Sequence, residues 1–170
     1  IETTGFSCVN NQIIEIGGVK VRNGQIVDHF SEFVNPHCPI PYEIVKLTSI
    51  TDEQVMDADD IETVLPKFLE FSKDCVLVAH NATFDEAVLR ANLDYYGIDH
   101  SSIAPFLCTY KIYGLSLDKL CYLLDIPLDN HHDAGFDALC CAKFYLNHLK
   151  GIEIDCSKLQ SMPTKVSETY

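Results

Sequence analysis

The chain has 170 residues, of which 47% are hydrophobic and 22% charged, and it carries a formal net charge of −13. This length is sufficient for one domain with a substantial core, and no apolar run approaches the roughly 20 residues that span a bilayer. The acidic balance argues against broad, non-specific binding of nucleic acid through a basic face. An acidic chain can still act on a polyanion if its carboxylates hold metal ions.

The eight cysteines include no CxxC pair, which argues against a zinc site. Several of them, such as Cys75 and Cys141, take apolar positions and are expected to be small buried hydrophobic residues. The first residues, Ile1 to Gly5, lack the basic and apolar regions of a signal peptide. These features predict a protein of the reducing cytoplasm that has no membrane partner.

Ile1-Glu2 is predicted to end a strand, and a turn follows at Thr4-Gly5. Residues 12–22 and 25–35 are rich in β-forming residues, and the Asn23-Gly24 pair between them is a strong hairpin signal. Thr51 is a plausible N-cap, because Asp52 and Glu53 follow it. Helices are predicted for three segments of this half: residues 42–47, 52–57 and 61–73.

The run Cys75 to Ala79 is continuously apolar, which predicts a strand buried on both faces. A helix over residues 84–96 would place Asp85 on the same face as Leu89 and Leu93. The remaining elements are an edge strand at 106–111, helices at 117–124 and 133–149, and a polar, loosely attached tail at 151–170. This order predicts an α/β domain over residues 1–150, with a mixed central sheet covered by helices.

The last predicted helix carries a carboxylate on its apolar side. Asp137 lies on a stripe of helical spacing formed by Ala134, Ala138, Cys141, Tyr145 and Leu149. A buried charge needs a partner, and a metal cation is one candidate. His132 comes five residues before Asp137, so it reaches the same site only from the loop before the helix, where it suits general-base work. The plainer alternative is a helix start with an ordinary core-edge aspartate.

Three acids stand out in the sequence: Glu2, Asp85 and Asp137. A single acid is usually a solvated or capping residue, but two of these lie on apolar helix faces and the third ends a strand. Glu2 ends a strand and Asp85 follows one, and ligands of α/β sheets bind outside the carboxyl ends of strands. Clustered carboxylates repel one another unless cations hold them together, and oxygen-only clusters suit Mg²⁺ or Mn²⁺. Two such ions can activate water and stabilise a leaving oxygen in phosphodiester hydrolysis.

Three motifs of this sequence resemble those of the DEDDh 3′–5′ exonucleases, which include the proofreading subunit and domains of bacterial polymerase III, RNase T and oligoribonuclease. The motifs are Glu2-Thr3-Thr4-Gly5, His80 to Asp85 and His132 to Asp137. Residues 47–51 (LTSIT) also resemble the family's usual LTGIT run. The resemblance extends from Ile1 to about Leu149 and implies a ribonuclease-H-like α/β fold.

The resemblance also implies roles for individual residues. Glu2, Asp85 and Asp137 would bind two Mg²⁺ or Mn²⁺ ions, and His132 would deprotonate the attacking water. The pocket for the 3′-terminal nucleotide would be lined by Thr3, Thr4, Gly5, Ile50, His80, Asn81 and Phe84.

Two positions depart from the family pattern. The first motif of the family opens with Asp-x-Glu, and the sequence starts at the middle residue of that triplet. We expect an Asp to be encoded immediately before Ile1, preceded by a short apolar strand that is central to the sheet. Ser49 replaces the usual Gly, and a positive φ at this position would strain the backbone.

The resemblance implies a metal-dependent 3′–5′ exonuclease that releases nucleoside 5′-monophosphates from the 3′ end of single-stranded DNA, with a DNA polymerase as an expected partner. RNA is an alternative substrate, because the motifs do not distinguish the sugar. A non-catalytic module that binds nucleic-acid ends or a polymerase is the alternative from another class, and a true absence of the first Asp would favour it.

Overall fold

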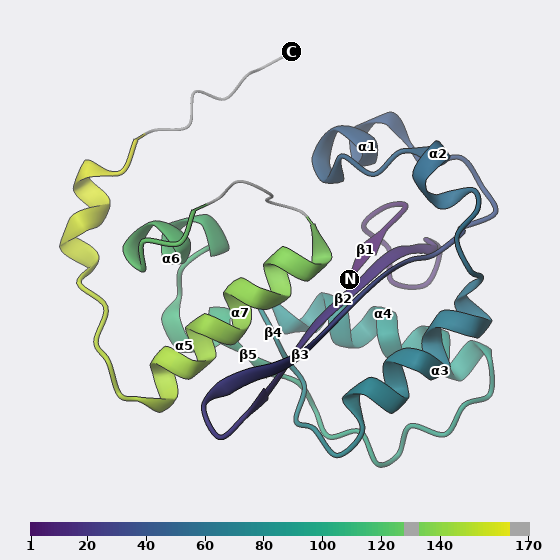
Figure 1. Cartoon of the computed structure of the whole chain (residues 1–170). Helices are drawn as coiled ribbons and strands as arrows, with labels where there is room; N and C mark the ends of the chain where they lie inside the picture. Colours follow the sequence, from purple (N-terminus) through teal and green to yellow (C-terminus); the bar gives the residue numbers. More distant parts are fainter. Residues whose placement is uncertain (128–132, 164–170) are drawn as a thin grey trace.

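The computed structural model describes residues 1–127 and 133–163 (Figure 1). In chain order the elements are β1 (Glu2–Thr3), β2 (Ile13–Arg22), β3 (Gln25–Phe33), α1 (Tyr42–Thr48), α2 (Asp52–Val55), α3 (Ile61–Ser72), β4 (Val78–Ala79), α4 (Ala82–Tyr95), β5 (Leu107–Cys108), α5 (Thr109–Tyr113), α6 (Leu117–Leu123), α7 (Ala134–Leu149) and the 3₁₀ helix η1 (Cys156–Ser161). The six predicted helices lie within two residues of their predicted bounds, whereas α5 and η1 were not predicted.

A long hairpin of β2 and β3 forms the centre of the molecule (Figure 1). Its turn is Asn23-Gly24, with φ values of 51° and 75°, and Arg22 pairs with Gln25. Both turn residues have the positive φ of a type I′ turn, whose twist matches that of the strands. The predicted hairpin is confirmed.

The strands form two sheets. The first is antiparallel with the order β1-β2-β3, and the second is the parallel pair β4-β5. Helices α7 and α3 lie on opposite faces of β2, since a Cβ atom on Gly17 would meet Ala134 of α7, whereas one on Gly18 would meet Phe71 and Phe68 of α3. The molecule is thus an α/β domain, as predicted.

The main core lies between β2 and helices α3 and α4, with fully buried Ile16, Leu65 and Leu93. A second cluster joins Ile14 of β2 to the α1–α2 region. A third lies between α6 and α7 around Phe144. The first two clusters pack on the first half of β2, so this half-strand anchors the residues around it.

The strand predicted for Cys75–Ala79 is confirmed only at Val78–Ala79, and the prediction that it is buried on both faces was wrong. Val76 is 62% exposed and Cys75 is half-buried, in contrast to fully buried Cys141. The reason is that β4 has a partner only in β5 among the residues that the structure describes. The predicted edge strand at 106–111 is likewise restricted to Leu107–Cys108, the two residues that β4 pairs with, and Thr109 already starts α5.

Residues 151–163 are mostly exposed, and a few contacts attach them to α6 and α7. Ile154 contacts the cluster between α6 and α7, and the Ser161 and Tyr122 hydroxyl groups are 3.3 Å apart. The end of the domain at residue 150 stays a prediction. Within residues 1–127 and 133–163, no helix has the length and apolar character needed to cross a membrane.

Candidate active site

Three separate elements bring the predicted acids together. Glu2 lies on β1, Asp85 in the first turn of α4 and Asp137 in the first turn of α7. The Ile1 ammonium donates a hydrogen bond to Asp85 Oδ1 at 2.7 Å, which ties β1 to α4. The N-terminus therefore lies inside the molecule, close to β1, β2 and α4 (Figure 1).

The pKa of Glu2 reports how close the acids are. Burial is the largest cause that raises this pKa, and the Asp137, Glu15 and Asp85 carboxylates raise it further, from 4.5 to about 7. The Ile1 ammonium acts in the opposite direction. Four carboxylates from four elements thus share one electrostatic environment, in which a negative charge is costly.

A positive charge is stabilised in the same place. Burial alone would lower the pKa of the Ile1 ammonium, but the Asp85, Glu2 and Asp137 carboxylates outweigh burial and raise this pKa. The shift is further evidence that the Asp85, Glu2 and Asp137 carboxylates lie close to one another.

This chemistry fits Mg²⁺ or Mn²⁺, because both ions prefer carboxylate oxygen ligands. In the part of the chain that the structure describes, no three Asp, Glu, His or Cys side chains are close enough together to hold a metal ion as they stand. The donor set is thus suitable, and its side chains would have to approach one another to bind an ion.

Glu15 was not predicted as a site residue, yet it fixes the start of α7. Its side chain is only 2% exposed, and its Oε2 accepts a hydrogen bond of 2.9 Å from the Ala134 amide. Next to it, a Cβ atom on Gly17 would lie 2.2 Å from the Ala134 carbonyl carbon. Strand β2 and the first turn of α7 can meet this closely only where residue 17 is a glycine. The sequence signal was an acid between apolar residues of a predicted strand.

The turn that carries Asp137 is also capped. Asp133 is the N-cap of α7, and its Oδ1 accepts a hydrogen bond of 2.7 Å from the Phe136 amide. The Asp133 cap and the contact of Glu15 with Ala134 together hold the backbone at Asp137 in place. His132, the predicted general base, lies outside the described residues, as does His131.

Thr3, Thr4 and Gly5 form the turn that follows β1. Both threonines are 5% exposed, and their hydroxyl groups serve the turn itself: Thr3 donates to the Gly5 carbonyl and Thr4 accepts from the Gln12 amide. Phe6, next along the chain, is 78% exposed. The Thr4 amide also donates a hydrogen bond of 2.8 Å to the Gln12 carbonyl, so the turn is firmly attached to the start of β2.

The second motif surrounds the start of α4. The His80 Nδ1 atom is 2.9 Å from the Thr109 hydroxyl, its ring lies edge-on to Tyr110 and Phe144, and burial lowers its pKa. Asn81 is exposed, with a φ of 63°, and Phe84 packs against the main core. These residues support the wall beside Asp85.

Ile50 is 4% exposed and packs in the cluster of β2, α1 and α2. Its predicted contact with a terminal base stays a prediction. Ser49 has a φ of 63° at the end of α1, which is the positive φ expected of the family's glycine. The expected strain at this position is therefore present.

Comparisons with known proteins identify the family of the chain. A family model described as Exonuclease (RNase T) matches residues 1–145. DNA polymerase III PolC-type of Caldanaerobacter subterraneus subsp. tengcongensis is 42% identical over 159 residues, which is 90% of this chain and 11% of that protein.

Two solved structures share the fold. Exonuclease X in complex with 5′ overhanging duplex DNA has a TM-score of 0.63 at 24% identity, over 90% of this chain and 91% of that one. The nuclease domain of 3′hExo, a DEDDh family member bound to rAMP, has a TM-score of 0.70 at 19% identity, over 85% and 86%.

The fold is thus the ribonuclease-H-like fold, and the class of protein that the family model defines is an exonuclease domain. The chain belongs to the exonuclease family, whose members generally depend on divalent metal ions. It spans about a tenth of the length of the curated PolC-type relatives that it matches.

Proposed function

We propose that the chain hydrolyses the terminal phosphodiester bond at the 3′ end of single-stranded DNA and releases nucleoside 5′-monophosphates. The observation that carries the proposal is that Glu2, Asp85 and Asp137 come from three elements and lie close enough for the Asp137 and Asp85 carboxylates to raise the pKa of Glu2. Solvated or capping carboxylates have no reason to gather from three elements, whereas a metal-assisted hydrolase needs this gathering.

Each residue has a part in this proposal. Glu2, Asp85 and Asp137 would hold two Mg²⁺ or Mn²⁺ ions, which would supply Lewis acidity and a more acidic water molecule. His132 accepts the proton of the attacking water, since an imidazole with an ordinary pKa of about 6.5 is a suitable base near neutral pH. The turn of Thr3, Thr4 and Gly5 and the wall of His80, Asn81, Phe84 and Ile50 position the terminal nucleotide.

DNA is the proposed substrate because the relatives that match at 42% identity are replicative polymerases of the PolC type. A DNA polymerase is accordingly the proposed partner, proofreading the proposed role and the bacterial cytoplasm the proposed location. RNA stays the alternative substrate, since the solved neighbours include one with bound DNA and one with bound rAMP.

The test is a digestion of 5′-labelled single-stranded DNA in Mg²⁺ or Mn²⁺, with and without EDTA. Two proteins should be compared: residues 1–170, and a longer chain in which Asp and the native segment upstream of it precede Ile1. We expect shortening from the 3′ end, no activity in EDTA, and no shortening when the 3′ end is blocked. Cleavage of circular single-stranded DNA would contradict the assignment as an exonuclease. If the protein digested RNA of the same sequence faster than DNA, RNA would replace DNA as the proposed substrate.

Metal binding is tested separately from activity. Millimolar Mn²⁺ should raise the melting temperature, because an ion that binds only the native state stabilises it. The rise should shrink in Asp137→Asn, whereas the exposed Asp28→Asn on β3 is the matched control. An equal rise in Asp137→Asn and wild type would remove Asp137 from the metal site.

A further inference from the structure

A fully buried hydroxyl group lies where three elements meet. It belongs to Thr109, the first residue of α5, which is 0% exposed. Thr109 Oγ1 is 2.9 Å from His80 Nδ1 and 3.6 Å from Cys141 Sγ. It also lies 3.4 Å from the Ala79 carbonyl oxygen, to which it can donate a hydrogen bond. The hydroxyl group thus contacts the end of β4, the residue that leads to α4, and the middle of α7.

All three contacts of Thr109 can be satisfied at once. A hydroxyl group has one proton and two lone pairs, so it donates one hydrogen bond and accepts up to two. Nδ1 of His80 donates in one tautomer and accepts in the other, and a hydroxyl group is a partner for either. A valine of the same shape could make none of these bonds, and a buried polar group left without its partner is destabilising.

The contact between Thr109 and His80 continues the pairing of β4 and β5. These strands pair in parallel, with Ala79 opposite Cys108. One step further along both strands places His80 opposite Thr109, and side chains in opposite positions lie on the same face of a sheet. The contact therefore follows from the register of the two strands.

The residue before Thr109 holds α4 at a second point. Cys108 Sγ accepts a hydrogen bond of 3.4 Å from the amide of Ala82, the first residue of α4. Burial raises the pKa of this thiol, but hydrogen bonds from backbone amides at the starts of α4 and α5 outweigh burial and lower the pKa. Cys108 and Thr109 together therefore fix the start of α4, and Asp85 lies three residues after Ala82.

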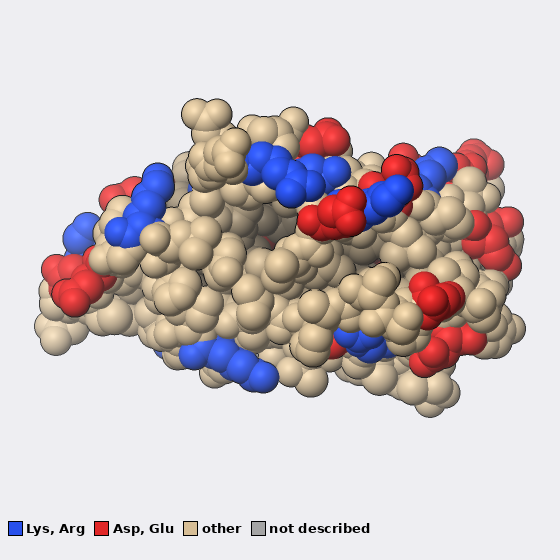
Figure 2. Space-filling model, turned by 90° about the horizontal axis from the view of Figure 1, so that it is seen from below, with Lys and Arg blue, Asp and Glu red and all other residues tan. Residues whose placement is uncertain are grey.

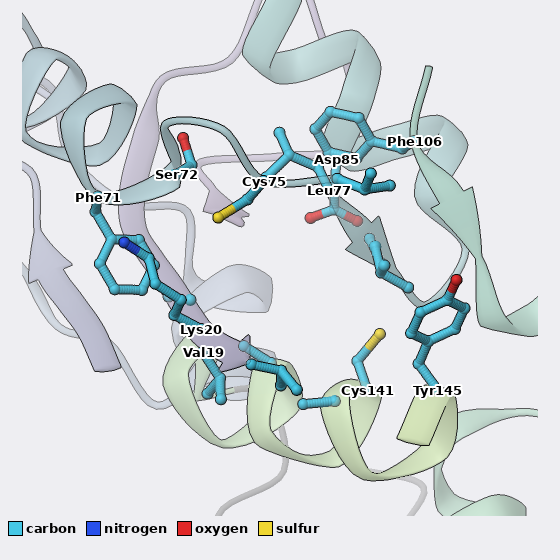
Figure 3. Close-up of a pocket in the computed structure, with 18 of the residues that line it drawn as sticks. Val19, Lys20, Phe71, Ser72, Cys75, Leu77, Asp85, Phe106, Cys141 and Tyr145 are labelled. Atoms are coloured by element: carbon cyan, nitrogen blue, oxygen red, sulfur yellow. The ribbon is translucent and has the colours of Figure 1, made fainter. Parts of the chain in front are cut away.

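The third contact of Thr109 reaches α7 on the side that carries Asp137. Cys141 comes four residues after Asp137, which places both side chains on one face of the helix. Figure 3 shows Cys141 of α7 and Asp85 of α4 on facing walls of a groove-shaped cavity of about 510 Å³. Thr109 thus connects the two walls from which the acids come.

Charged side chains contribute little to the lining of this cavity. Figure 2 shows a hollow in one face of the molecule, with charged side chains mainly around the hollow and not inside it. The charged side chains that line the cavity are those of Lys20, Arg22, Asp74 and Asp85. Apart from the Ile1 ammonium, the position of the Asp85 carboxylate therefore depends on the backbone turn that carries it.

We propose that Thr109 is a positioning residue of the candidate active site. Its hydroxyl group holds the turn that leads to Asp85 at a fixed distance from α7, so that Asp85 and Asp137 can approach the same metal ions. Because Thr109 is fully buried, it acts through His80, Cys141 and the backbone and not through contact with substrate. The inference rests on the proposed function, since this distance matters for chemistry only if both acids hold the ions.

The test uses the longer chain with which the proposed function is tested. Thr109→Val keeps the size and branching of the side chain and removes the hydroxyl group. Because small misplacements of reacting groups are costly, kcat on single-stranded DNA should fall at least about tenfold, with KM changed by less than about twofold. The Mn²⁺ concentration that gives half of the melting shift should rise at least about fivefold.

Thr109→Ser separates the hydroxyl group from the rest of the side chain. It keeps the hydroxyl and loses a buried methyl group, so its melting temperature should be lower than that of wild type. Its kcat and its Mn²⁺ concentration at half shift should nevertheless return close to the wild-type values. A residue that only stabilised the fold would instead change activity in step with the melting temperature.

A further readout needs neither metal nor substrate. The ¹⁵N NMR signals of the His80 ring in the metal-free protein report the hydrogen bond at Nδ1. Thr109→Val should shift the Nδ1 signal, because valine offers neither a donor nor an acceptor, and Thr109→Ser should keep it near the wild-type position.

Tyr113→Phe is the matched control on the same helix. The Tyr113 hydroxyl donates a hydrogen bond of 2.8 Å to the Phe144 carbonyl, so this change also removes a hydroxyl contact between α5 and α7, farther from Asp137. It should lower the melting temperature and leave both kcat and the Mn²⁺ concentration at half shift as in wild type.

Two results would overturn the inference alone, with wild type active and responsive to Mn²⁺. One is a Thr109→Val chain whose kcat and Mn²⁺ response equal those of Tyr113→Phe, and the other is a folded Thr109→Ser chain no better than Thr109→Val. A wild-type chain without any Mn²⁺ shift would overturn the proposed function and this inference with it. If Thr109→Val does not fold, Thr109→Ser and Thr109→Ala, which differ only in the hydroxyl group, make the same comparison.

Discussion

The two halves of β2 have similar sequences and different surroundings. Ile13, Ile14 and Ile16 are at most 2% exposed, whereas Val19 and Val21, which are also β-branched, are only half-buried. The first half has β1 and β3 as neighbours and lies near the acid cluster, and the second half has β3 alone and faces the groove. The burial of a strand is thus determined by what lies beside it more than by its own residues.

The same contrast runs along α7. Its first turn is held by Glu15, Gly17 and the Asp133 cap, and it presents Asp137 to the site. Its later turns contribute Ala138, Cys141 and Tyr145 to the lining of a cavity of about 510 Å³. One end of the molecule is therefore arranged for chemistry and the other for packing, which predicts that substitutions at the two ends affect different measurements.

The largest effect is expected at the chemical end. His132→Ala should lower turnover by roughly 10²–10⁴-fold, the usual contribution of a general base. Steady-state digestion of single-stranded DNA measures this. The Mn²⁺-dependent melting shift should persist, since an imidazole is a poor ligand for hard cations.

His131→Ala is the control for this prediction and should lose far less activity. A greater loss in His131→Ala than in His132→Ala would show that the wrong histidine had been assigned.

The next largest effect concerns the contact between β2 and α7. In Gly17→Ala the new Cβ atom would lie 2.2 Å from backbone of Ala134, which must move. We expect a loss of about 3 kcal/mol in the free energy of unfolding, at the upper end of overpacking effects, together with reduced turnover. Urea denaturation and digestion rates measure the two.

Gly18→Ala is the matched control one residue away. Its Cβ atom would lie 3.0 Å from the Phe71 ring, a side chain that can shift. It should cost less than Gly17→Ala and leave turnover unchanged. Equal effects of the two changes would mean that the approach of α7 is not the limiting contact.

Glu15→Ala should have a smaller effect than Gly17→Ala, but it should still lower both the free energy of unfolding and turnover. It leaves the Ala134 amide without its acceptor, which costs about 1–3 kcal/mol, and it loosens the turn that carries Asp137. Glu15→Gln keeps an acceptor and should recover most of the stability and of kcat. If Gln performed no better than Ala, the charge of Glu15 and not its hydrogen bond would be what matters.

A pH effect should follow from Glu2. Its pKa is about 7 in the folded chain against an ordinary value of 4.5, so the folded state holds a proton that the unfolded state releases across this window. In EDTA the melting temperature should therefore fall as the pH rises from 4.5 to 7, and then level off. Glu2→Gln should flatten this fall. A melting temperature that rises over the same window would contradict the assigned environment.

The smallest effect is expected away from both ends. Ser49 has a φ of 63°, which glycine adopts without strain, so Ser49→Gly should stabilise the fold by about 1 kcal/mol or less. This corresponds to roughly 2–4 °C per kcal/mol in the melting temperature. Ser49→Ala, which keeps the strain, should give no such gain.

Local signals in the sequence predicted much of this architecture. The Asn23-Gly24 turn, the helices and the stripe of α7 depend on neighbouring residues, and the three acids were found because they occupied unusual places on such elements. The burial of Cys75–Ala79 was predicted wrongly, because an apolar run does not reveal whether a neighbouring strand is present. The roles of Glu15 and Gly17 were missed because their contacts join residues far apart in the chain.

The position of the free strand edges has a consequence for solubility. An exposed, flat edge invites other sheets to add to it and so promotes aggregation. Among the described residues, the edge of β2 beyond its pairing with β1 lies instead beside a cavity that α7 and α3 line. The outer strand β3 carries Asp28 and Glu32, charged side chains of the kind that discourage pairing between sheets. The charged side chains of β3 thus help the fold to resist polymerisation through its sheets.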